Sequence, residues 1–566
     1  MLAGTSAQAE TLLRWNQAGY APGRPIQLLA LSEQDLAGQA WRVVPLSPPP
    51  ASAPLLTGQM GASVTGVGAH SSFPFNHLVD LSMLRTPGRY RLTLADGPSA
   101  ELIVAPAPYA RLLPEPLLHL RAMRSGSAET RLRKFSHPGD ARALVWVPAG
   151  DPANGHWQAA APARTVNLLG GWYDAGDQIK FTLNHAYTVY HLLLAYRQEP
   201  ALFRRVHSVS DLPDILDEAR HGLEFLARTF PDPETFVIQV GDERDHEQVD
   251  RLPENDPLDG QRPALCALSR VHMHATTAAL ALGARTFLEL GRDAEARRYS
   301  TLALAIHART RQPGTVATAF ERGKINDFYH DPSEEDQAAL AAMELHALTG
   351  DATYLEAARR LAPRAGTEVS WAEWHWLANA ALAPHDPAAR ERLLAETETY
   401  AHYAATQGAP WRLPTAYTWG SLHRWIGAAN AARMASRIVG PSPAREALFY
   451  GMLDYTFGCN NWGVAFLFSP QLPNSVQHLY SPAYQLLGAF PTGALSEGPG
   501  ARAMHEAMAR HFRTSEANPL ARFDTAAAVF SDSSEDFMCQ EATITGQADA
   551  MLLLTLASLP PPAGTP

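Results

Sequence analysis

The rest of the chain is organised around the stretch Gly170-Gly171-Trp172-Tyr173-Asp174-Ala175-Gly176-Asp177-Gln178-Ile179-Lys180-Phe181. Two carboxylates, Asp174 and Asp177, follow two aromatic rings, Trp172 and Tyr173, and glycines flank the set. Glycine lets the backbone turn tightly and approach a ligand closely. Aromatic rings offer flat faces to a cyclic ligand, and paired carboxylates can hold and deprotonate water. The pattern is compatible with a site that activates water, but the residues alone favour the commoner alternative, a polar turn whose aspartates only cap the next helix.

The composition limits the classes of protein to consider. The chain has 566 residues, of which 46% are hydrophobic and 18% charged, as in soluble globular proteins with at least two domains. Its 46 basic and 57 acidic side chains give a net charge of −11. Since no Lys/Arg block stands out, we expect no nucleic-acid partner. The longest apolar runs, such as Met551–Leu559, are shorter than the ~20 residues that span a bilayer, so we expect no membrane partner.

Cysteines and the N-terminal residues carry less information. Cys266, Cys459 and Cys539 are odd in number and widely spaced, which argues against a disulfide framework and shows no zinc-type pairing, so we expect buried thiols and no metal. Ala7-Gln8-Ala9 is similar to the end of a signal peptide, without the basic and apolar segments that precede such an end. We expect a secreted or periplasmic protein if an upstream signal peptide was trimmed, and a cytoplasmic one otherwise.

Residues 10–105 show the pattern of a small β-sandwich. Strands are predicted at Pro25–Leu31, Trp41–Val44, Phe73–Leu81 and Arg89–Leu94, separated by Gly, Pro and Ser clusters. In the last of these, Tyr90, Leu92 and Leu94 alternate with polar residues, as in a half-buried strand. Short strands at regular spacing are typical of a sandwich.

Helical spacing dominates residues 106–560. Apolar side chains recur at i, i+3, i+4 and i+7 from Leu212 to Leu226, with acidic residues between them. Further helices are predicted near 186–194, 274–290, 293–308, 335–349, 352–362, 371–383, 388–405, 419–437, 443–457, 501–513 and 541–558. With almost no strand signal, this pattern predicts an all-α domain. Periodicity alone equally allows a barrel, an irregular bundle or a helical solenoid.

A second carboxylate candidate lies near the C-terminus. The segment Phe537-Met538-Cys539-Gln540-Glu541-Ala542-Thr543-Ile544 precedes an apolar helix. Paired carboxyl groups can divide acid and base work between them, and Glu541 is the candidate partner of the turn's aspartates. The alternative is an ordinary acidic residue in the first turn of a helix, where the helix dipole favours it.

Together, these motifs resemble glycoside hydrolase family 9, the family of inverting cellulases. The turn at 170–181 resembles its Tyr-Asp-Ala-Gly-Asp signature, and Glu541 its closing motif. Val240-Gly241-Asp242 with Asp245-His246, the helix at 213–218, the turn at 350–355 and Trp419-Gly420-Ser421 are also similar to family segments. The opening Asn16-Gln17-Ala18-Gly19-Tyr20 and Gly88-Arg89-Tyr90 resemble the immunoglobulin-like domain that precedes many bacterial members.

The resemblance implies a mainly α fold, an (α/α)6 barrel at 106–560 preceded by an immunoglobulin-like β-sandwich at 10–105. It implies that Asp177 is the base, that Asp174 orients the same water, and that Glu541 is the acid, with inversion and carboxyls ~6.5–9.5 Å apart. It also implies substrate contacts from the following residues: Trp172, Tyr173, His246, Trp419 and His478. For His246 and Trp419, a loop histidine and a core tryptophan without substrate contact are the alternatives.

Several positions depart from the family pattern. Val249 replaces a tryptophan, and Gln477-His478-Leu479 replaces His-His-Arg, so a multi-donor guanidinium clamp is missing. The calcium-associated Asp-Glu pair reads Asp336-Gln337, which leaves fewer charged oxygens for the ion. We therefore expect no required cofactor, and a structural calcium only as a doubtful possibility.

The resemblance predicts an enzyme that hydrolyses a β-1,4-linked glucan or oligosaccharide. One alternative is an exo-acting β-glucosidase or β-glucosaminidase of the same family, whose short substrates would not need the missing Arg and Trp. A non-catalytic glycan-binding protein is a second alternative, although binding alone would not need Asp174, Asp177 and Glu541. A polysaccharide lyase is a third, although its substrates call for a Tyr or His base among basic residues, whereas this turn is acidic.

Overall fold

The computed structural model describes residues 9–47, 54–95, 97–127, 134–206, 210–361, 363–367, 369–370, 373–512 and 517–562. Ala7 and Gln8 of the signal-like stretch lie outside these residues. No helix within the described ranges has the length and apolar character needed to cross a membrane.

Alternating strands near the N-terminus build a β-sandwich. One sheet has the order β1-β2-β5 and the other β4-β3-β6-β7, with antiparallel pairs throughout. Buried side chains from both sheets form a single core, and Tyr90, Leu92 and Leu94 point into it as predicted. The strands are β1 (Thr11–Arg14), β2 (Gln27–Ser32), β3 (Ala40–Ser47), β4 (Leu56–Gln59), β5 (Phe75–Asp80), β6 (Gly88–Leu94) and β7 (Ser99–Val104). An immunoglobulin-like architecture is confirmed for this region.

The helical region closes into a ring. In the described part of the chain, six buried helices contact one another in the cyclic order α2-α5-α7-α9-α11-α16-α2. These inner helices are α2 (Thr182–Gln198), α5 (Arg270–Glu289), α7 (Glu335–Thr349), α9 (His375–Leu382), α11 (Ser421–Val439) and α16 (Ile544–Ser558). Almost every side chain of α16 is buried, because a helix that is apolar all round has no face suited to water.

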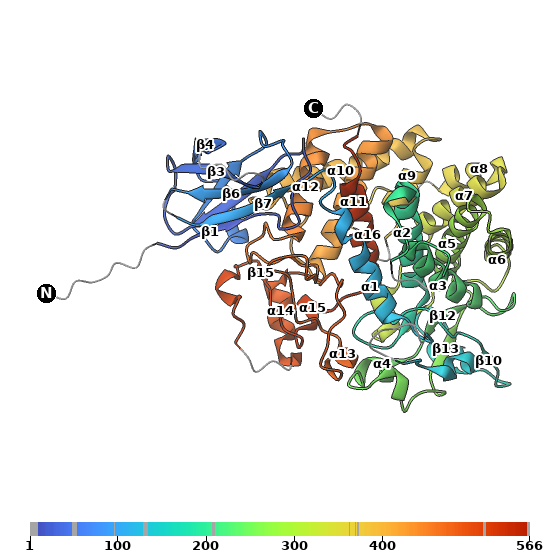
Figure 1. Cartoon of the computed structure of the whole chain (residues 1–566). Coiled ribbons are helices and arrows are strands. Elements are labelled where there is room, and N and C mark those ends of the chain that lie inside the picture. The colour runs from blue at the N-terminus through green and yellow to red at the C-terminus, as the bar shows by residue number, and fades with distance from the viewer. Residues whose placement is uncertain are drawn as a thin grey trace.

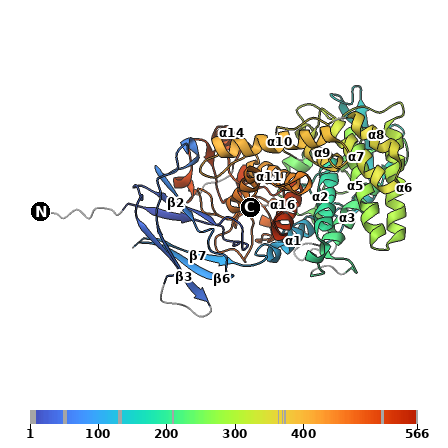
Figure 2. The same ribbon diagram turned by 90° about the horizontal axis from the view of Figure 1, so that it is seen from above.

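Outer helices alternate with the inner ones along the chain. They are α1 (Pro114–Met123), α3 (Asp214–Arg228), α6 (Asp293–Thr310), α8 (Ala352–Leu361), α10 (Pro387–Thr406) and α12 (Pro443–Thr456). Each packs against inner neighbours, as α3 does against α2 and α5. This alternation confirms the (α/α)6 barrel (Figures 1 and 2), and the sandwich packs on the side of the helical domain opposite α6.

A small sheet at one end of the barrel was not predicted. Its strands follow the order β10-β8-β13-β12-β11, with β9 added on β8. They are β8 (Ala143–Ala149), β9 (His156–Ala159), β10 (Thr165–Val166), β11 (Lys180–Phe181), β12 (Val237–Val240) and β13 (Pro263–Cys266). All residues of β11, β12 and β13 are buried, so these short strands lack the in–out alternation that identifies a strand in sequence.

Buried polar contacts join the sandwich to the barrel. The Arg24 guanidinium donates from Nη2 to both carboxylate oxygens of Asp454 on α12, each at 2.6 Å, and from Nη1 to the Tyr109 hydroxyl at 2.6 Å. The Asn16 side chain donates to Asp454 Oδ1 at 2.8 Å. β7 ends at Val104 and α1 begins at Pro114, and we propose the division into 10–105 and 106–560 on that basis.

Candidate active site

The signature turn depends on its glycines. Gly170 and Gly171 have φ of +99° and +74°, which side chains rarely adopt. A Cβ on Gly171 would also lie 2.6 Å from His185 Nε2. At Gly176, the backbone N–H donates to Glu541 Oε1 at 2.9 Å, and a Cβ would lie only 2.9 Å from the same oxygen. Glycine therefore allows the two ends of the helical domain to meet.

Asp174, Asp177 and Glu541 line one cavity of about 660 Å³. The turn reaches it directly before β11, and Glu541 reaches it between α15 (Phe537–Gln540) and α16. Glu541 is thus not in the first turn of α16, as the alternative interpretation of the sequence held, but at the end of α15. Its backbone is also bridged to Tyr480, another residue of the cavity wall.

Asp174 is held by neutral donors. Its Oδ1 accepts from the Asn184 side chain at 2.8 Å, and the Tyr329 hydroxyl also hydrogen-bonds its carboxyl group. The carboxyl group is 1% exposed. Burial raises its pKa to about 7, and the charge of Asp177 acts in the same direction.

Asp177 faces a histidine across the cavity. Its Oδ1 accepts from the backbone N–H of Ile179 at 2.9 Å, and its Oδ2 lies 3.0 Å from His246 Nδ1. The hydrogen bond and charge of Asp177 raise the pKa of His246. Both residues reach this place through β11 and β12, since Lys180 pairs with Val240 and the chain then enters α4 (Glu243–Glu247), which carries His246.

Glu541 carries a proton more readily than an ordinary glutamate. Burial, followed by the charge of Asp177, raises its pKa to about 8. Its Oε1 accepts the Gly176 N–H, so a proton on this carboxyl group resides on Oε2. This arrangement suits a group that must donate a proton near neutral pH.

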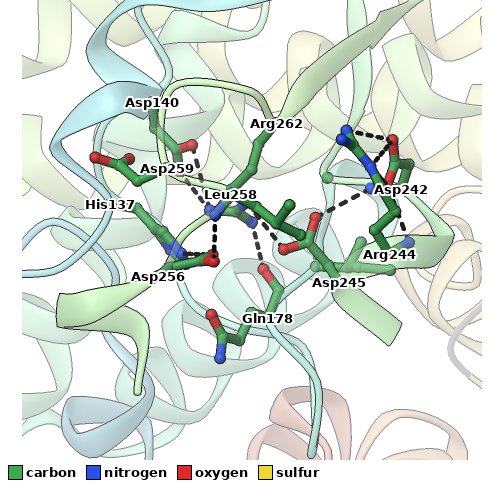
Figure 3. A network of polar contacts seen from close by, with 12 residues as sticks. His137, Asp140, Gln178, Asp242, Arg244, Asp245, Asp256, Leu258, Asp259 and Arg262 are labelled. Carbon is green, nitrogen blue, oxygen red and sulfur yellow. Dashed lines mark hydrogen bonds and ion pairs between the residues drawn. The ribbon is translucent and has the colours of Figure 1, made fainter. Parts of the chain in front are cut away.

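A buried polar network fixes the turn and α4 to each other (Figure 3). Arg262 donates to the backbone carbonyl of Gln178, to Asp140 Oδ2 at 3.0 Å, and pairs through Nε with Asp245 Oδ1 at 3.3 Å. Asp245 completes a capping box with Asp242 at the start of α4. Lys180 Nζ lies 2.6 Å from Asp140 Oδ2 and donates to two carbonyls of the loop that leads into the turn. The network therefore fixes the backbone beside Asp177 relative to the backbone beside His246.

Two of the predicted substrate contacts are wrong for this structure. Trp172 is fully buried, and its indole N–H donates to Glu218 at 3.2 Å. Tyr173 is 1% exposed, and its hydroxyl bonds Ser136 Oγ at 2.8 Å and His137 Nδ1 at 2.7 Å. Neither ring lines the cavity. Each packs in the core instead and satisfies its polar end there, as buried Trp and Tyr require.

Of the three remaining predicted contacts, two line the cavity and one does not. His246 and Trp419 line the cavity, and the Trp419 ring stacks on Phe537 with centroids 5.6 Å apart. His478 does not line it; its side chain is 59% exposed and lies 3.6 Å from Asp532. Val249, which replaces the family's tryptophan, does line the cavity.

Some cavity residues had no recognised sequence signal. Glu497 is 4% exposed, and Thr543 donates to its Oε1 at 3.3 Å. Burial raises its pKa, and it adds a further carboxyl group to the cavity wall. A Cβ on Gly420 would collide with its Oε2. Tyr329, the hydrogen-bond partner of Asp174, also went unrecognised.

The residues at the family's calcium position do not fit that ion. Asp336 accepts the backbone N–H groups of Gln337 at 3.0 Å and Trp374 at 2.6 Å. The Gln337 amide donates to Asp331 Oδ2 at 2.5 Å. An N–H group therefore faces this oxygen, whereas a hard cation requires oxygen ligands. Burial raises the pKa of both aspartates to about 7, so neither carries a full negative charge for the ion near neutral pH.

The sequence profile of Glycosyl hydrolase family 9 matches residues 109–554. The chain belongs to this family. Endoglucanase C of Cellulomonas fimi is 26% identical over 478 residues, which are 75% of this chain and 42% of that protein. Endoglucanase 13 of Oryza sativa subsp. indica is 29% identical over 282 residues, 46% of this chain and 40% of that protein. The chain thus spans less than half the length of these family 9 relatives.

Solved structures share the fold over nearly the whole chain. A metagenome-derived glycoside hydrolase family 9 endoglucanase matches with a TM-score of 0.78 and 22% identity, covering 97% of this chain and 99% of that one. A mutant thermostable endoglucanase from Alicyclobacillus acidocaldarius matches with a TM-score of 0.76 and 20% identity, with coverage of 97% and 99%. Both matches include the sandwich together with the barrel.

Proposed function

We propose that this family 9 protein is an inverting glycoside hydrolase that cleaves β-1,4-linked glucan or its oligosaccharides. The observation that carries the proposal is the meeting of Asp174, Asp177 and Glu541 in one cavity, with Glu541 protonated near neutral pH. Relatives named endoglucanases support this substrate class.

Each carboxyl group has one task in this mechanism. Glu541 gives its Oε2 proton to the glycosidic oxygen as the bond from the anomeric carbon to that oxygen breaks. A water molecule attacks the anomeric carbon from the opposite face and passes its proton to Asp177. Asp174 accepts a hydrogen bond from the same water and keeps it oriented. Solvent then removes the proton from Asp177 and returns one to Glu541, and the product has the inverted configuration.

An exo-acting enzyme on short amino-sugar oligomers is the second candidate, and Glu497 favours it. Seven acidic side chains line the cavity: Asp174, Asp177, Glu247, Asp250, Glu497, Glu535 and Glu541. Such a set attracts a cationic amino group. The departures at Val249 and Leu479 also remove groups that would hold a long glucan.

One experiment separates these candidates. The protein is incubated with cello-oligosaccharides and with chito-oligosaccharides, both acetylated and deacetylated, and the products and their anomeric configuration are followed by NMR. We expect inverted products from cello-oligosaccharides, and loss of hydrolysis in Asp177→Ala and Glu541→Gln. Hydrolysis that survives both substitutions would remove the site assignment. Cleavage of deacetylated chito-oligosaccharides alone would favour the second candidate. Unsaturated products would indicate a lyase, and tight binding without products a glycan-binding protein.

A further inference from the structure

Three potential metal ligands meet beside the acid-bearing segment, outside the residues used above. They are His505 on α14 (Arg502–Met508), Asp536 at the start of α15, and Cys539 on α15. The ligand atoms of all three lie within 4.8 Å of one another. His505 Nε2 is 2.8 Å from Asp536 Oδ2. The set combines imidazole, carboxylate and thiol, which are the ligand types that Zn²⁺ takes.

The distances suit a tetrahedral ion. With Zn–N and Zn–O near 2.0–2.1 Å and Zn–S near 2.3 Å, ligand atoms in a tetrahedral site stand about 3.3–3.6 Å apart. His505 Nε2 and Asp536 Oδ2, at 2.8 Å, are somewhat closer than that, and the other pairs lie within 4.8 Å, so shifts on the order of 1 Å would close the site. Asp536 and Cys539 are 1% and 0% exposed, whereas the His505 side chain is 16% exposed. The histidine side therefore leaves an entry path and room for a water as fourth ligand.

The surrounding backbone holds these ligands in place. β14 (Gly500–Ala501) directly precedes α14 and pairs with β15 (Ala528–Val529). The Cys539 thiol lies 3.7 Å from the Val529 carbonyl. Asp536 accepts the Cys539 backbone N–H at 3.1 Å as the cap of α15. The two ligands are three residues apart and therefore lie on the same side of a single helical turn.

We infer that His505, Asp536 and Cys539 form a binding site for a zinc-type divalent cation that joins α14 to α15. Both elements contribute to the cavity. Met508 at the end of α14 and His511 just after it line the cavity, as do Phe537 on α15 and Glu541 directly after α15. A bound ion would tie one wall of the cavity to the segment that carries the acid. The inference differs at Cys539 from the expectation from sequence that the three cysteines signal no metal site.

Cobalt(II) titration of the full-length protein after treatment with a chelator tests the inference, because a thiolate–Co²⁺ bond gives an intense near-ultraviolet charge-transfer band. We expect the band to saturate at one equivalent and to disappear on addition of Zn²⁺. Cys539→Ser and His505→Gln should abolish the band, while Cys266→Ser, a change at another buried thiol, should leave it intact.

His505→Gln keeps the test valid if Cys539→Ser fails to fold, because His505 lies partly at the surface. Zn²⁺ should also raise the unfolding temperature of the native protein and not that of His505→Gln. No band in the native protein, or a band that persists in His505→Gln, would overturn the inference. The readouts do not depend on hydrolysis, so failure here is distinct from failure of the proposed function.

Discussion

Replacing Glu541 by glutamine should abolish hydrolysis and at the same time stabilise the fold at alkaline pH. Burial and the charge of Asp177 raise the pKa of Glu541 to about 8 from an ordinary value of 4.5. Glutamine has the same shape, and its amide oxygen can still accept the Gly176 N–H. The substitution therefore removes the titrating proton and leaves the packing unchanged.

The sign follows from where the proton binds. Between pH 4.5 and about 8, Glu541 is ionised in the unfolded chain and protonated in the folded one. The folded state binds more protons in this window, so the free energy of unfolding falls as pH rises through it. The full displacement corresponds to about 5 kcal/mol at ~1.4 kcal/mol per pKa unit. Because the side chain is partly exposed, we expect about 2–3 kcal/mol after solvent screening.

Denaturant unfolding at pH 4, 7 and 9 measures this effect. The free energy of unfolding of Glu541→Gln should be nearly equal to that of the native protein at pH 4, and should exceed it most at pH 9. Glu535→Gln is the matched control, since it replaces another glutamate that lines the same cavity. A gain in Glu541→Gln that is equal at all three pH values would contradict the reasoning.

The activity of the same variant gives an independent measurement. Loss of a general acid should lower kcat about 10²–10⁴-fold on oligosaccharides. The loss should be much smaller on aryl glycosides of acidic phenols, because such leaving groups depart without a proton. In the native protein, kcat/KM should fall as pH rises above about 8. Equal losses on both substrate types would refute the assignment of Glu541 as acid.

Three further perturbations have defined outcomes. His246→Gln replaces the imidazole that lies 3.0 Å from Asp177 Oδ2, so kcat should fall with little change in KM; an unchanged kcat would show that the contact has no catalytic effect. Gly176→Ala puts a Cβ within 2.9 Å of the acid's oxygen, and should lower kcat at least tenfold with little change in the far-ultraviolet circular dichroism. Arg24→Met leaves Asp454 buried without its cation, and should destabilise the protein by about 3–5 kcal/mol in denaturant unfolding; a second change, Asp454→Leu, should recover part of the loss.

The signals that sequence analysis used were local ones. Apolar spacing predicted most helices of the barrel within a few residues, because each helix buries one stripe or all of its surface. The turn at 170–181 was identified by its resemblance to a signature of the family, which is likewise a local pattern. By contrast, the predicted contacts of Trp172 and Tyr173 failed. The direction of each ring depends on partners distant in sequence, Glu218 for one and His137 for the other, and no local pattern encodes these.

The part of the fold that the sequence did not reveal is the part that positions the site. β11 leaves the turn after Asp177 and pairs with β12, and β12 leads into α4 with His246. Arg262, just before β13, contacts both the Gln178 carbonyl and the Asp245 carboxylate, and so joins the turn to α4. A periodic barrel alone would bring the turn and α16 to the same end, but it would not orient Asp177 relative to His246. Ile238 of β12 and Leu265 of β13 also belong to the main core that α2, α5 and α16 form, so the sheet is joined to the barrel core as well as to the site.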